Sequence, residues 1–397
     1  MHCPMVDADK MNKPLIYFTF GTRPEAIKMA PVVKTFLNDA QFHTKIVITA
    51  QHREMLDQVM DIFDIPSHFD FNIMAPRQTL NFITTEVMNK FSALLAQEKP
   101  SLVLVHGDTT TAFASTLASF YYQVPVAHVE AGLRSHDLEN PFPEEMNRKL
   151  ADALCSHHFC PTTIARENLI KEGINPSNSF ITGNTIVDAL LMIVEQITSE
   201  EEKKVFPQWD PGKKTILMTM HRRESWGEQM KNVAHAVSDV LQNRQDVQLL
   251  FPMHRNPAVR EIIEPIFSDH PQVFLTDPMD YRQFVIAMKL SYLIISDSGG
   301  IQEEAPSLNK PVLLTRKVTE RPEGLNSGVV KLVGTEYHKV HEELLKLIDH
   351  EENYRQMVCK RNPFGDGKAS KRIHQYVRHI LGLDQGIWEK EREAFNG

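Results

Sequence analysis

The sequence predicts an α/β protein of two tandem domains, each built on a doubly wound parallel sheet. The chain has 397 residues, more than a single hydrophobic core usually serves. Short apolar runs rich in β-branched residues alternate with longer amphipathic stretches, which is typical of βαβ units. The alternation weakens at residues 199–214, a charged segment with two prolines and a glycine, and then restarts. We therefore expect two Rossmann-like domains that face each other across a cleft, where the carboxyl ends of both sheets bind ligands.

In the first half, four apolar runs are each too short for a helix and predict buried parallel strands: residues 15–20, 45–49, 102–106 and 125–129. Amphipathic stretches predict helices between them: residues 25–37 and 79–96. In the second half, five further runs predict the strands of a second sheet: residues 215–220, 248–252, 273–275, 292–296 and 311–314. From residue 369 onward the pattern is again helical.

These elements set the expected domain boundaries. Residues 1–13 are polar and predict a disordered leader rather than a signal peptide. Residues 14–200 form the expected N-terminal domain, and residues 201–375 form the C-terminal domain. Residues 376–397 are expected to be a helical tail that packs back on the N-terminal domain.

Charge and composition narrow the function. The formal net charge of -8 argues against general nucleic-acid binding, because a phosphate backbone demands a basic surface. No window approaches ~18 uninterrupted apolar residues, so we expect no membrane span. The four cysteines are scattered and complete no zinc-binding set, which indicates free thiols in a reducing compartment and no metal site. We expect a cytoplasmic protein.

The turn after the first predicted strand is suited to phosphate. Gly21 permits a tight turn, and Pro24 suits the first turn of a helix. The helix N-terminus offers N–H groups, and Arg23 adds a planar fork of donors. The turn matches neither the G-x-G-x-x-G dinucleotide fingerprint nor a Walker motif. A plain strand-to-helix connection with a surface arginine is the alternative.

Three carboxylates stand where the predicted sheet ends or a helix begins: Asp108, Glu130 and Glu144. Each has a structural alternative. Asp108 is expected either at the cleft or as a helix cap beside Thr109, which can itself cap the helix. Glu130 can pair with Arg134, and Glu144 can complement a helix dipole. Crowded carboxylates raise one another's pKa, which would prepare one proton acceptor and one proton donor.

Groups suited to a nucleoside diphosphate follow the strands of the second half: His221, Arg222, His254, Ser298, Gly299, Gly300, Glu304 and Arg321. Residues 298–300 read Ser-Gly-Gly before a helix, a backbone cradle for an anion, with a simple tight connection as the alternative. Glu304 is placed to reach a ribose diol. The residues alone therefore predict a nucleoside-diphosphate ligand whose other end undergoes proton chemistry.

Long motifs make the chain resemble the non-hydrolysing UDP-N-acetylglucosamine 2-epimerases. They are GTRPEAIKMAP (21–31), QHREMLDQ (51–58), VHGDTTT (105–111), HVEAGLR (128–134), PEEMNR (143–148), ITGNTIVDAL (181–190), HRRE (221–224), SDSGGIQEEAPSL (296–308) and TERPEG (319–324). The resemblance runs from about residue 14 to about residue 375.

This resemblance implies a fold, a reaction and a set of residues. The fold is the GT-B-like arrangement shared with one large class of glycosyltransferases. The reaction is reversible inversion at C2 of UDP-N-acetylglucosamine, by anti elimination of UDP to 2-acetamidoglucal and re-addition, for cell-surface polysaccharide precursors. No metal or redox cofactor is implied. The catalytic positions match Asp108, Glu130, Glu144 and His221, and the UDP-binding positions match Arg23, Lys28, Phe284, Ser298, Gly299, Gly300, Glu304 and Arg321.

The family also has an allosteric site for a second UDP-N-acetylglucosamine, and homodimers are common in it. That site matches Gln51, Glu54, Arg77, Glu144, Arg222 and His254. These matches favour the non-hydrolysing branch. The alternatives are a hydrolysing epimerase that releases N-acetylmannosamine and UDP, a retaining glycosyltransferase of the same architecture, and a non-catalytic nucleotide-sugar sensor, which would be expected to lack one or more of the three carboxylates.

Overall fold

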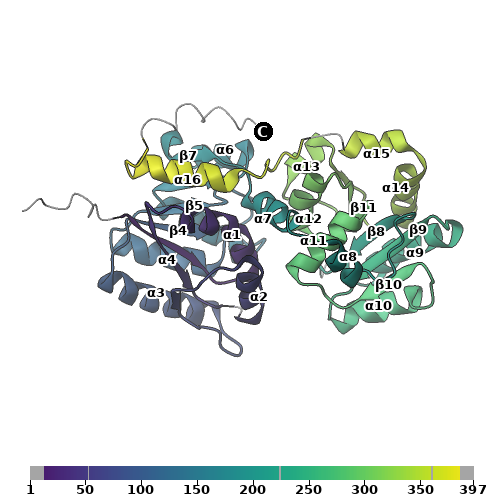
Figure 1. The fold of residues 1–397 in the computed structure, drawn as a ribbon, viewed down its shortest axis with the longest axis horizontal. Coiled ribbons are helices and arrows are strands. Elements are labelled where there is room, and N and C mark those ends of the chain that lie inside the picture. Colours follow the sequence, from purple (N-terminus) through teal and green to yellow (C-terminus); the bar gives the residue numbers. More distant parts are fainter. Residues whose placement is uncertain (1–12, 52, 223–224, 359–360, 385–397) are drawn as a thin grey trace, which may run out of the picture. The chain divides into compact units, whose positions relative to one another are not determined.

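The computed structural model describes residues 13–51, 53–222, 225–358 and 361–384, and its contacts divide the chain into two compact units (Figure 1). Unit 1 runs to Ala189 and resumes at Gly367, and unit 2 spans Leu190–Asp366. The expected leader, apart from Lys13, and the tail beyond residue 384 lie outside the described residues. Each unit is an α/β domain with a fully parallel sheet.

The sheet of unit 1 has the strand order β3-β2-β1-β4-β5-β6-β7. Its strands are β1 Leu15–Phe20, β2 His43–Ile48, β3 Phe69–Asp70, β4 Leu102–His106, β5 Val126–Val129, β6 His157–Cys160 and β7 Ser179–Ile181. The four strands predicted in this half are confirmed within two residues at either end, whereas β3, β6 and β7 were not predicted. Because β1, β4 and β5 are neighbours, the turns that follow them lie along one sheet edge.

Helices cover both faces of this sheet. They are α1 Arg23–Leu37, α2 Arg53–Phe63, α3 Leu80–Gln97, α4 Thr110–Tyr121, α5 Glu144–Leu154, α6 Thr163–Lys171, the 3-10 turn η1 Pro176–Asn178, α7 Thr185–Val194, in which the division between the units falls, and α16 Ala369–Ile380. The predicted helices 25–37 and 79–96 correspond to α1 and α3.

The C-terminal helix α16 belongs to unit 1, so the observed division at Asp366/Gly367 precedes the expected one at 375/376. Buried Asp188 accepts hydrogen bonds from the backbone N–H of Ala369 (3.1 Å) and of Ser370 (2.8 Å), which are at the N-terminus of α16. Further along, Tyr376 packs on Phe180 of β7 with ring centroids 3.7 Å apart. The carboxylate of Asp188 thus caps the N-terminus of α16, although Asp188 is distant from this helix in the sequence.

Removing this carboxylate is expected to destabilise unit 1. Asp188→Ala leaves two buried N–H groups without their acceptor, which costs roughly 1–3 kcal/mol of unfolding free energy. Urea unfolding of the full chain measures the loss. Asp188→Asn, which keeps one side-chain oxygen acceptor, is the matched control and is expected to lose less. Equal stability of wild type and Asp188→Ala would contradict the assignment.

The sheet of unit 2 has the order β10-β9-β8-β11-β12-β13. Its strands are β8 Lys214–Thr219, β9 Val247–Pro252, β10 Val273–Thr276, β11 Leu293–Ser296, β12 Val312–Leu314 and β13 Val330–Leu332. The five predicted strands are confirmed within two residues, and only β13 was not predicted among the described strands of this unit. The helical elements are α8 Ser199–Val205, α9 Glu228–Asn243, α10 Pro257–Phe267, α11 Tyr281–Leu290, α12 Gly299–Glu304, η3 Ala305–Leu308, α13 Pro322–Ser327, α14 Tyr337–Asp349 and α15 Glu351–Val358.

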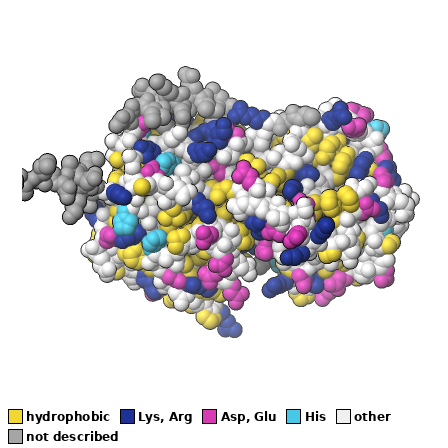
Figure 2. Space-filling model, viewed as in Figure 1, with side chains coloured by type: hydrophobic (Ala, Val, Ile, Leu, Met, Phe, Trp, Pro, Cys, Tyr) yellow, Lys and Arg dark blue, Asp and Glu magenta, His cyan; other side chains and the backbone are white. Residues whose placement is uncertain are grey.

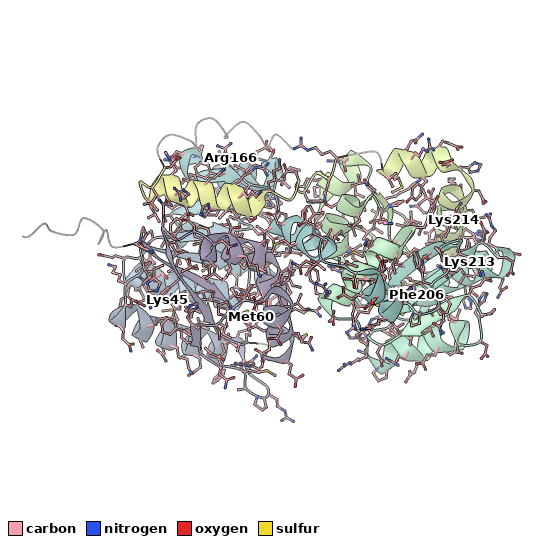
Figure 3. The ribbon with its side chains drawn as sticks, in the orientation of Figure 1. Lys45, Met60, Arg166, Phe206, Lys213 and Lys214 are labelled. Carbon is pink, nitrogen blue, oxygen red and sulfur yellow. The ribbon has the colours of Figure 1, made fainter. Side chains whose placement is uncertain are left out.

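The expected linker at 199–214 is structured, which moves the division of the chain from the expected 200/201 to Ala189/Leu190. It begins with α8, and α8 is tied to α11 of unit 2 because Arg282 donates to Glu201 (2.8 Å). Phe206 and Lys214, both labelled in Figure 3, continue this attachment. Phe206 is buried against the ring of Phe274, and Lys214 donates to the carbonyl of Ile348.

The side of the surface drawn in Figure 2 shows no large basic area, as expected from the negative net charge. On the face drawn in Figure 2, acidic and basic side chains are interspersed rather than gathered into one basic area. None of the helices within the described ranges has both the length and the apolar composition needed to cross a bilayer. Those ranges also contain no group of three or more histidine, cysteine or acidic residues arranged to hold a metal ion.

Candidate active site

The turn between β1 and α1 is held by a buried glutamate. Glu25 accepts hydrogen bonds from the backbone N–H of Gly21 (3.0 Å) and of Thr22 (2.8 Å), in a capping box. A Cβ on Gly21 would lie 2.0 Å from Oγ1 of Thr49, so only glycine fits. These two N–H groups, which precede the first helical residue Arg23, are therefore engaged by Glu25 and are not free for a phosphate. Arg23, the first residue of α1, is exposed and is the charged group of this turn that faces solvent.

Glu25 also connects this turn to the next one along the sheet edge. The hydroxyl of Thr109 donates to its Oε1 at 2.6 Å. Burial raises the pKa of Glu25 to about 7, against the hydrogen bonds, which act to lower it. The T-x-x-E pattern before an apolar helix is the sequence signal for Glu25, which was not among the site residues predicted from the sequence.

Asp108 lies in the turn after β4 and is bound by α5. Arg148 donates to Oδ2 of Asp108 from Nε (3.0 Å) and Nη2 (2.7 Å), and Asn147 donates to its backbone carbonyl (3.0 Å). The alternative that Asp108 caps α4 is wrong. Thr109 is the N-cap, as was also considered, because its side chain accepts from the N–H of Ala112 (3.0 Å). The Asp108 side chain keeps 31% of its surface exposed, so one face of the carboxylate is open.

Glu130 follows β5, and its partners differ from the expected one. Lys28 of α1 forms a close ion pair with Glu130 Oε2, and the amide of Asn184 donates to the same oxygen at 3.0 Å. Arg134, the expected partner, instead binds Asp152 and Glu172. The structural alternative of a Glu130–Arg134 salt bridge is therefore wrong. Glu130 has a positive φ of 64°, a strained backbone conformation that turns the chain at the end of β5.

Glu144 and Glu145 open α5 but have different surroundings. Glu145 is fully buried and accepts from the backbone N–H of Ser135 (3.0 Å) and from Arg148 (2.7 Å). Glu144 is partly exposed, and it precedes Arg148 by four residues on the same helix. Residues four apart share a helix face, so Glu144 lies on the face that holds Asp108.

The site of unit 1 therefore pairs carboxylates with cations rather than crowding carboxylates together. Asp108 forms an ion pair with Arg148, and Glu130 forms one with Lys28. His106, at the end of β4, lies beside them with Nε2 3.8 Å from Oε2 of Glu130. Burial lowers the pKa of His106 to about 3, so its ring is neutral, and its Nε2 has no hydrogen-bond partner among the described residues. Arg148, Asn184 and His106 were not among the site residues predicted from the sequence.

In unit 2, His221 is oriented by a buried carboxylate. Asp297 is fully buried and accepts from the backbone N–H of His221 (3.1 Å) and of Arg222 (3.0 Å). Its Oδ1 also lies 3.1 Å from Nδ1 of His221. Burial acts to raise the pKa of Asp297. The contacts with His221 and with the backbone N–H of Arg222 together outweigh burial, so the pKa of Asp297 is lowered. Nδ1 of His221 is thereby engaged, and Nε2 is left for other chemistry.

Neutralising this carboxylate is expected to slow turnover. Asp297→Asn removes the charge that orients His221, and kcat is expected to fall about 10-fold or more, with little change in KM. Steady-state kinetics of the full chain measures both constants. Asp269→Asn, an exposed position after α10, is the matched control. An unchanged kcat in Asp297→Asn would exclude the orienting role.

Most of the remaining groups predicted to hold UDP in unit 2 lie in α12 or against its first turn. Ser298 is the N-cap residue and Gly299 the first residue of α12. A Cβ on Gly299 would come 2.7 Å from Nη1 of Arg321, which places that guanidinium against the turn. Arg321 donates to Glu303 (2.6 Å) and Glu320 (2.8 Å).

Glu304, which ends α12, accepts from the hydroxyl of Tyr281 at 2.8 Å. Gly300 is the second residue of the helix, and Phe284 is part of α11. A cavity of about 560 Å³ elsewhere in unit 2 is lined by Phe206, Met253, Phe274 and their neighbours, and by none of the predicted site residues.

The residues matched to an allosteric site fall in both units. In unit 1, Gln51 accepts from Thr111 (3.2 Å) and its carbonyl accepts from Gln78 (3.0 Å), beside the exposed Arg77. Glu54 is exposed in the first turn of α2. In unit 2, Arg222 lies 3.5 Å from Glu320, and His254 is exposed.

Comparisons with known proteins agree on one family. The family described as UDP-N-acetylglucosamine 2-epimerase matches residues 34–378. The chain is 48% identical over 365 residues to the UDP-N-acetylglucosamine 2-epimerase of Escherichia coli (strain K12), covering 91% of this chain and 97% of that protein. It is 46% identical over 358 residues to that of Neisseria meningitidis serogroup A, covering 89% and 96%.

Solved structures give the same result. The crystal structure of the Neisseria meningitidis UDP-GlcNAc 2-epimerase bound to UDP-GlcNAc matches with a TM-score of 0.84 at 45% identity, covering 93% of this chain and all of that one. A UDP-GlcNAc 2-epimerase from Methanocaldococcus jannaschii, in complex with UDP-GlcNAc and UDP, matches with a TM-score of 0.75 at 30% identity, covering 92% and 99%. The GT-B-like class predicted from the sequence is confirmed. With a family match across most of its length and relatives this similar, the chain belongs to the UDP-N-acetylglucosamine 2-epimerase family.

Proposed function

We propose that this chain interconverts UDP-N-acetylglucosamine and UDP-N-acetylmannosamine without hydrolysis, as an isomerase that needs no cofactor. The single observation that carries the proposal is the pair of carboxylates after neighbouring strands β4 and β5, each in an ion pair with a cation from a helix. An ionised carboxylate is a proton acceptor, and inversion at C2 needs proton exchange on both faces of that carbon. The relatives named above support the choice of substrate.

The proposed step is an anti elimination. The C2–H bond breaks and its proton passes to a carboxylate, while the C1–O bond breaks and its electron pair leaves with UDP, so that 2-acetamidoglucal forms. A proton then enters the opposite face of C2, and UDP returns to C1. We assign the proton transfers to Asp108, Glu130 and Glu144. We assign His221 to the departing phosphate, because Asp297 orients its ring.

UDP needs stabilisation of its growing negative charge, worth ~3–4 kcal/mol for each well-placed donor. Its proposed binding groups are Arg23, Lys28, Phe284, Ser298, Gly299, Gly300, Glu304 and Arg321. The contact of Arg321 with the turn at Gly299 supports this assignment in unit 2. Lys28 would serve both the diphosphate and Glu130, since one ammonium has three donors.

Two further properties belong to the proposal. The first is activation by a second UDP-N-acetylglucosamine, through Gln51, Glu54, Arg77, Glu144, Arg222 and His254. The second is a homodimer. The packed helices α3 and α4 leave large apolar side chains exposed, including Phe120 (55%) and Tyr121 (66%), and exposed apolar area of this kind favours an interface.

Isotope exchange tests the proposal. The full chain is incubated with UDP-N-acetylglucosamine in deuterated water, and C2 is followed by NMR. Deuterium at C2 of both UDP-sugars is the expected result. A retaining glycosyltransferase would leave the C2 hydrogen in place. Free N-acetylmannosamine with UDP would instead identify a hydrolysing epimerase.

A further inference from the structure

A buried histidine next to the proposed site has acceptors on both sides of its ring. His128 of β5 is completely buried. Its Nδ1 lies 2.6 Å from Oδ1 of Asp152, and its Nε2 lies 2.7 Å from the carbonyl oxygen of Gly107. A carbonyl and an ionised carboxylate only accept hydrogen bonds, so both ring nitrogens must donate. A ring that donates from both nitrogens is an imidazolium.

In the hydrogen bond between Nδ1 of His128 and Asp152, the proton could in principle belong to Asp152. Asp152 is ionised, however, so the proton belongs to His128. Its second oxygen accepts from Nη2 of Arg134 at 2.8 Å, and a guanidinium favours the charged form of its partner. Burial acts to raise the pKa of Asp152, but His128 and Arg134 outweigh it and hold the pKa at about 2. Burial likewise acts to lower the pKa of His128, and Asp152 and the Gly107 carbonyl outweigh it, so that pKa is raised.

The groups that surround His128 form a balanced set. The titratable or charged residues that face it are Asp152 of α5, His158 of β6, His106 of β4 and Arg134 of the loop after β5. Burial lowers the pKa of His106 to about 3, so its ring is not a cation, and burial also lowers the pKa of His158. Glu172 binds Arg134 at 2.6 Å and balances its charge. His128 and Asp152 are then a neutral pair, as are Arg134 and Glu172.

We propose that His128 is a positioning residue whose imidazolium holds the Gly107 carbonyl and thereby fixes the turn that carries Asp108. This inference rests on the proposed function, in which Asp108 exchanges a proton with C2. Gly107 has a positive φ of 64° and directly precedes Asp108. Asn147 holds the next carbonyl, that of Asp108 itself (3.0 Å). Two successive carbonyls of this turn therefore have donors: the charged ring of His128 in β5 binds that of Gly107, and the neutral amide of Asn147 in α5 binds that of Asp108.

Loss of the proton from His128 would disturb this turn. A neutral ring keeps one N–H, and its bond to Asp152 would leave the lone pair of Nε2 facing the lone pairs of the Gly107 oxygen. The turn would then shift and carry Asp108 away from C2. The stability that this pair contributes is fully present between about pH 4 and about pH 6.5, the ordinary pKa values of aspartate and histidine. It is lost as the pH rises through the raised pKa of His128, and also as the pH falls through the lowered pKa of Asp152. Turnover should follow the same alkaline limb.

Histidine NMR of the full chain tests the charge directly and needs no substrate. With ¹⁵N-labelled histidine at pH 7.5, the His128 ring is expected to show protons on both nitrogens. Comparison with His128→Gln assigns the signal. If that variant does not fold, Asp152→Asn, which perturbs the same ring, assigns it instead. A neutral His128 ring at pH 7.5 overturns the inference whether or not the enzyme reaction is the proposed one.

Kinetics then tests the positioning role. His128→Gln is expected to lower kcat about 10-fold or more, with KM for UDP-N-acetylglucosamine changed less than threefold, since small misplacements of reacting groups are costly. Asp152→Asn is expected to move the alkaline limb of kcat to lower pH. His158→Gln is the control, because Nε2 of His158 binds the backbone carbonyl of Asp152 (2.9 Å) and not the Gly107 turn. A wild-type pH profile in Asp152→Asn, or a wild-type kcat in His128→Gln, overturns the proposal.

Discussion

Asp108→Asn is expected to lower kcat by about 100-fold or more while UDP binding stays within about threefold of wild type. The asparagine keeps the size of the side chain and one oxygen for Arg148, but it cannot take a proton from C2. The UDP-binding groups of unit 2 are unchanged. Turnover at saturating UDP-N-acetylglucosamine measures the first effect, and calorimetric titration with UDP measures the second.

A companion and a control make this result specific. Glu144→Gln is expected to behave in the same way, since Glu144 lies on the helix face that holds Asp108. Asp61→Asn removes a carboxylate from an exposed position of α2 and is expected to leave both measurements unchanged. Wild-type turnover in both Asp108→Asn and Glu144→Gln would refute their roles.

The fold was predictable where the apolar pattern is clear. The strands β1, β4 and β8 are apolar runs with buried neighbours, and their composition alone identifies them. β6 reads His-His-Phe-Cys and was missed, because it begins with two histidines and His158 is buried despite its polarity. His158, for example, binds the backbone carbonyl of Asp152. A sequence pattern records polarity but not the partner that compensates it.

For the candidate site, the sequence predicted where two of the proposed carboxylates lie. Asp108 and Glu130 follow strands β4 and β5, which is where parallel sheets place ligand-binding groups. Their cations were not predicted, because Arg148 is 40 residues from Asp108 and Lys28 is 102 residues from Glu130. Only the packing of α5 and α1 against the sheet edge brings these side chains together. The nearest arginine in the sequence, Arg134, was the wrong choice for Glu130 because it is engaged by Asp152 and Glu172.

Glu130→Gln is expected to lower kcat by about 100-fold or more and also to destabilise unit 1. The side chains of Lys28 and Glu130 are only 12% and 9% exposed. Removing the carboxylate charge takes from the largely buried ammonium of Lys28 the counter-charge of Glu130, which costs roughly 1–3 kcal/mol, because the glutamine still offers one acceptor. Turnover at saturating substrate and urea unfolding of the same preparation measure the two effects separately.

A double variant separates proton transfer by Glu130 from charge balance. Lys28→Met combined with Glu130→Gln removes both charges, so stability should recover relative to Glu130→Gln alone, since a buried pair can be replaced by neutral groups at little cost. Turnover should stay as low as in Glu130→Gln, because no carboxylate returns. Lys28→Met alone shows how much the lysine itself contributes to turnover and to UDP affinity. If the double variant regained turnover together with stability, Glu130 would serve only to neutralise Lys28, and the proton at C2 would have to pass through Asp108 and Glu144.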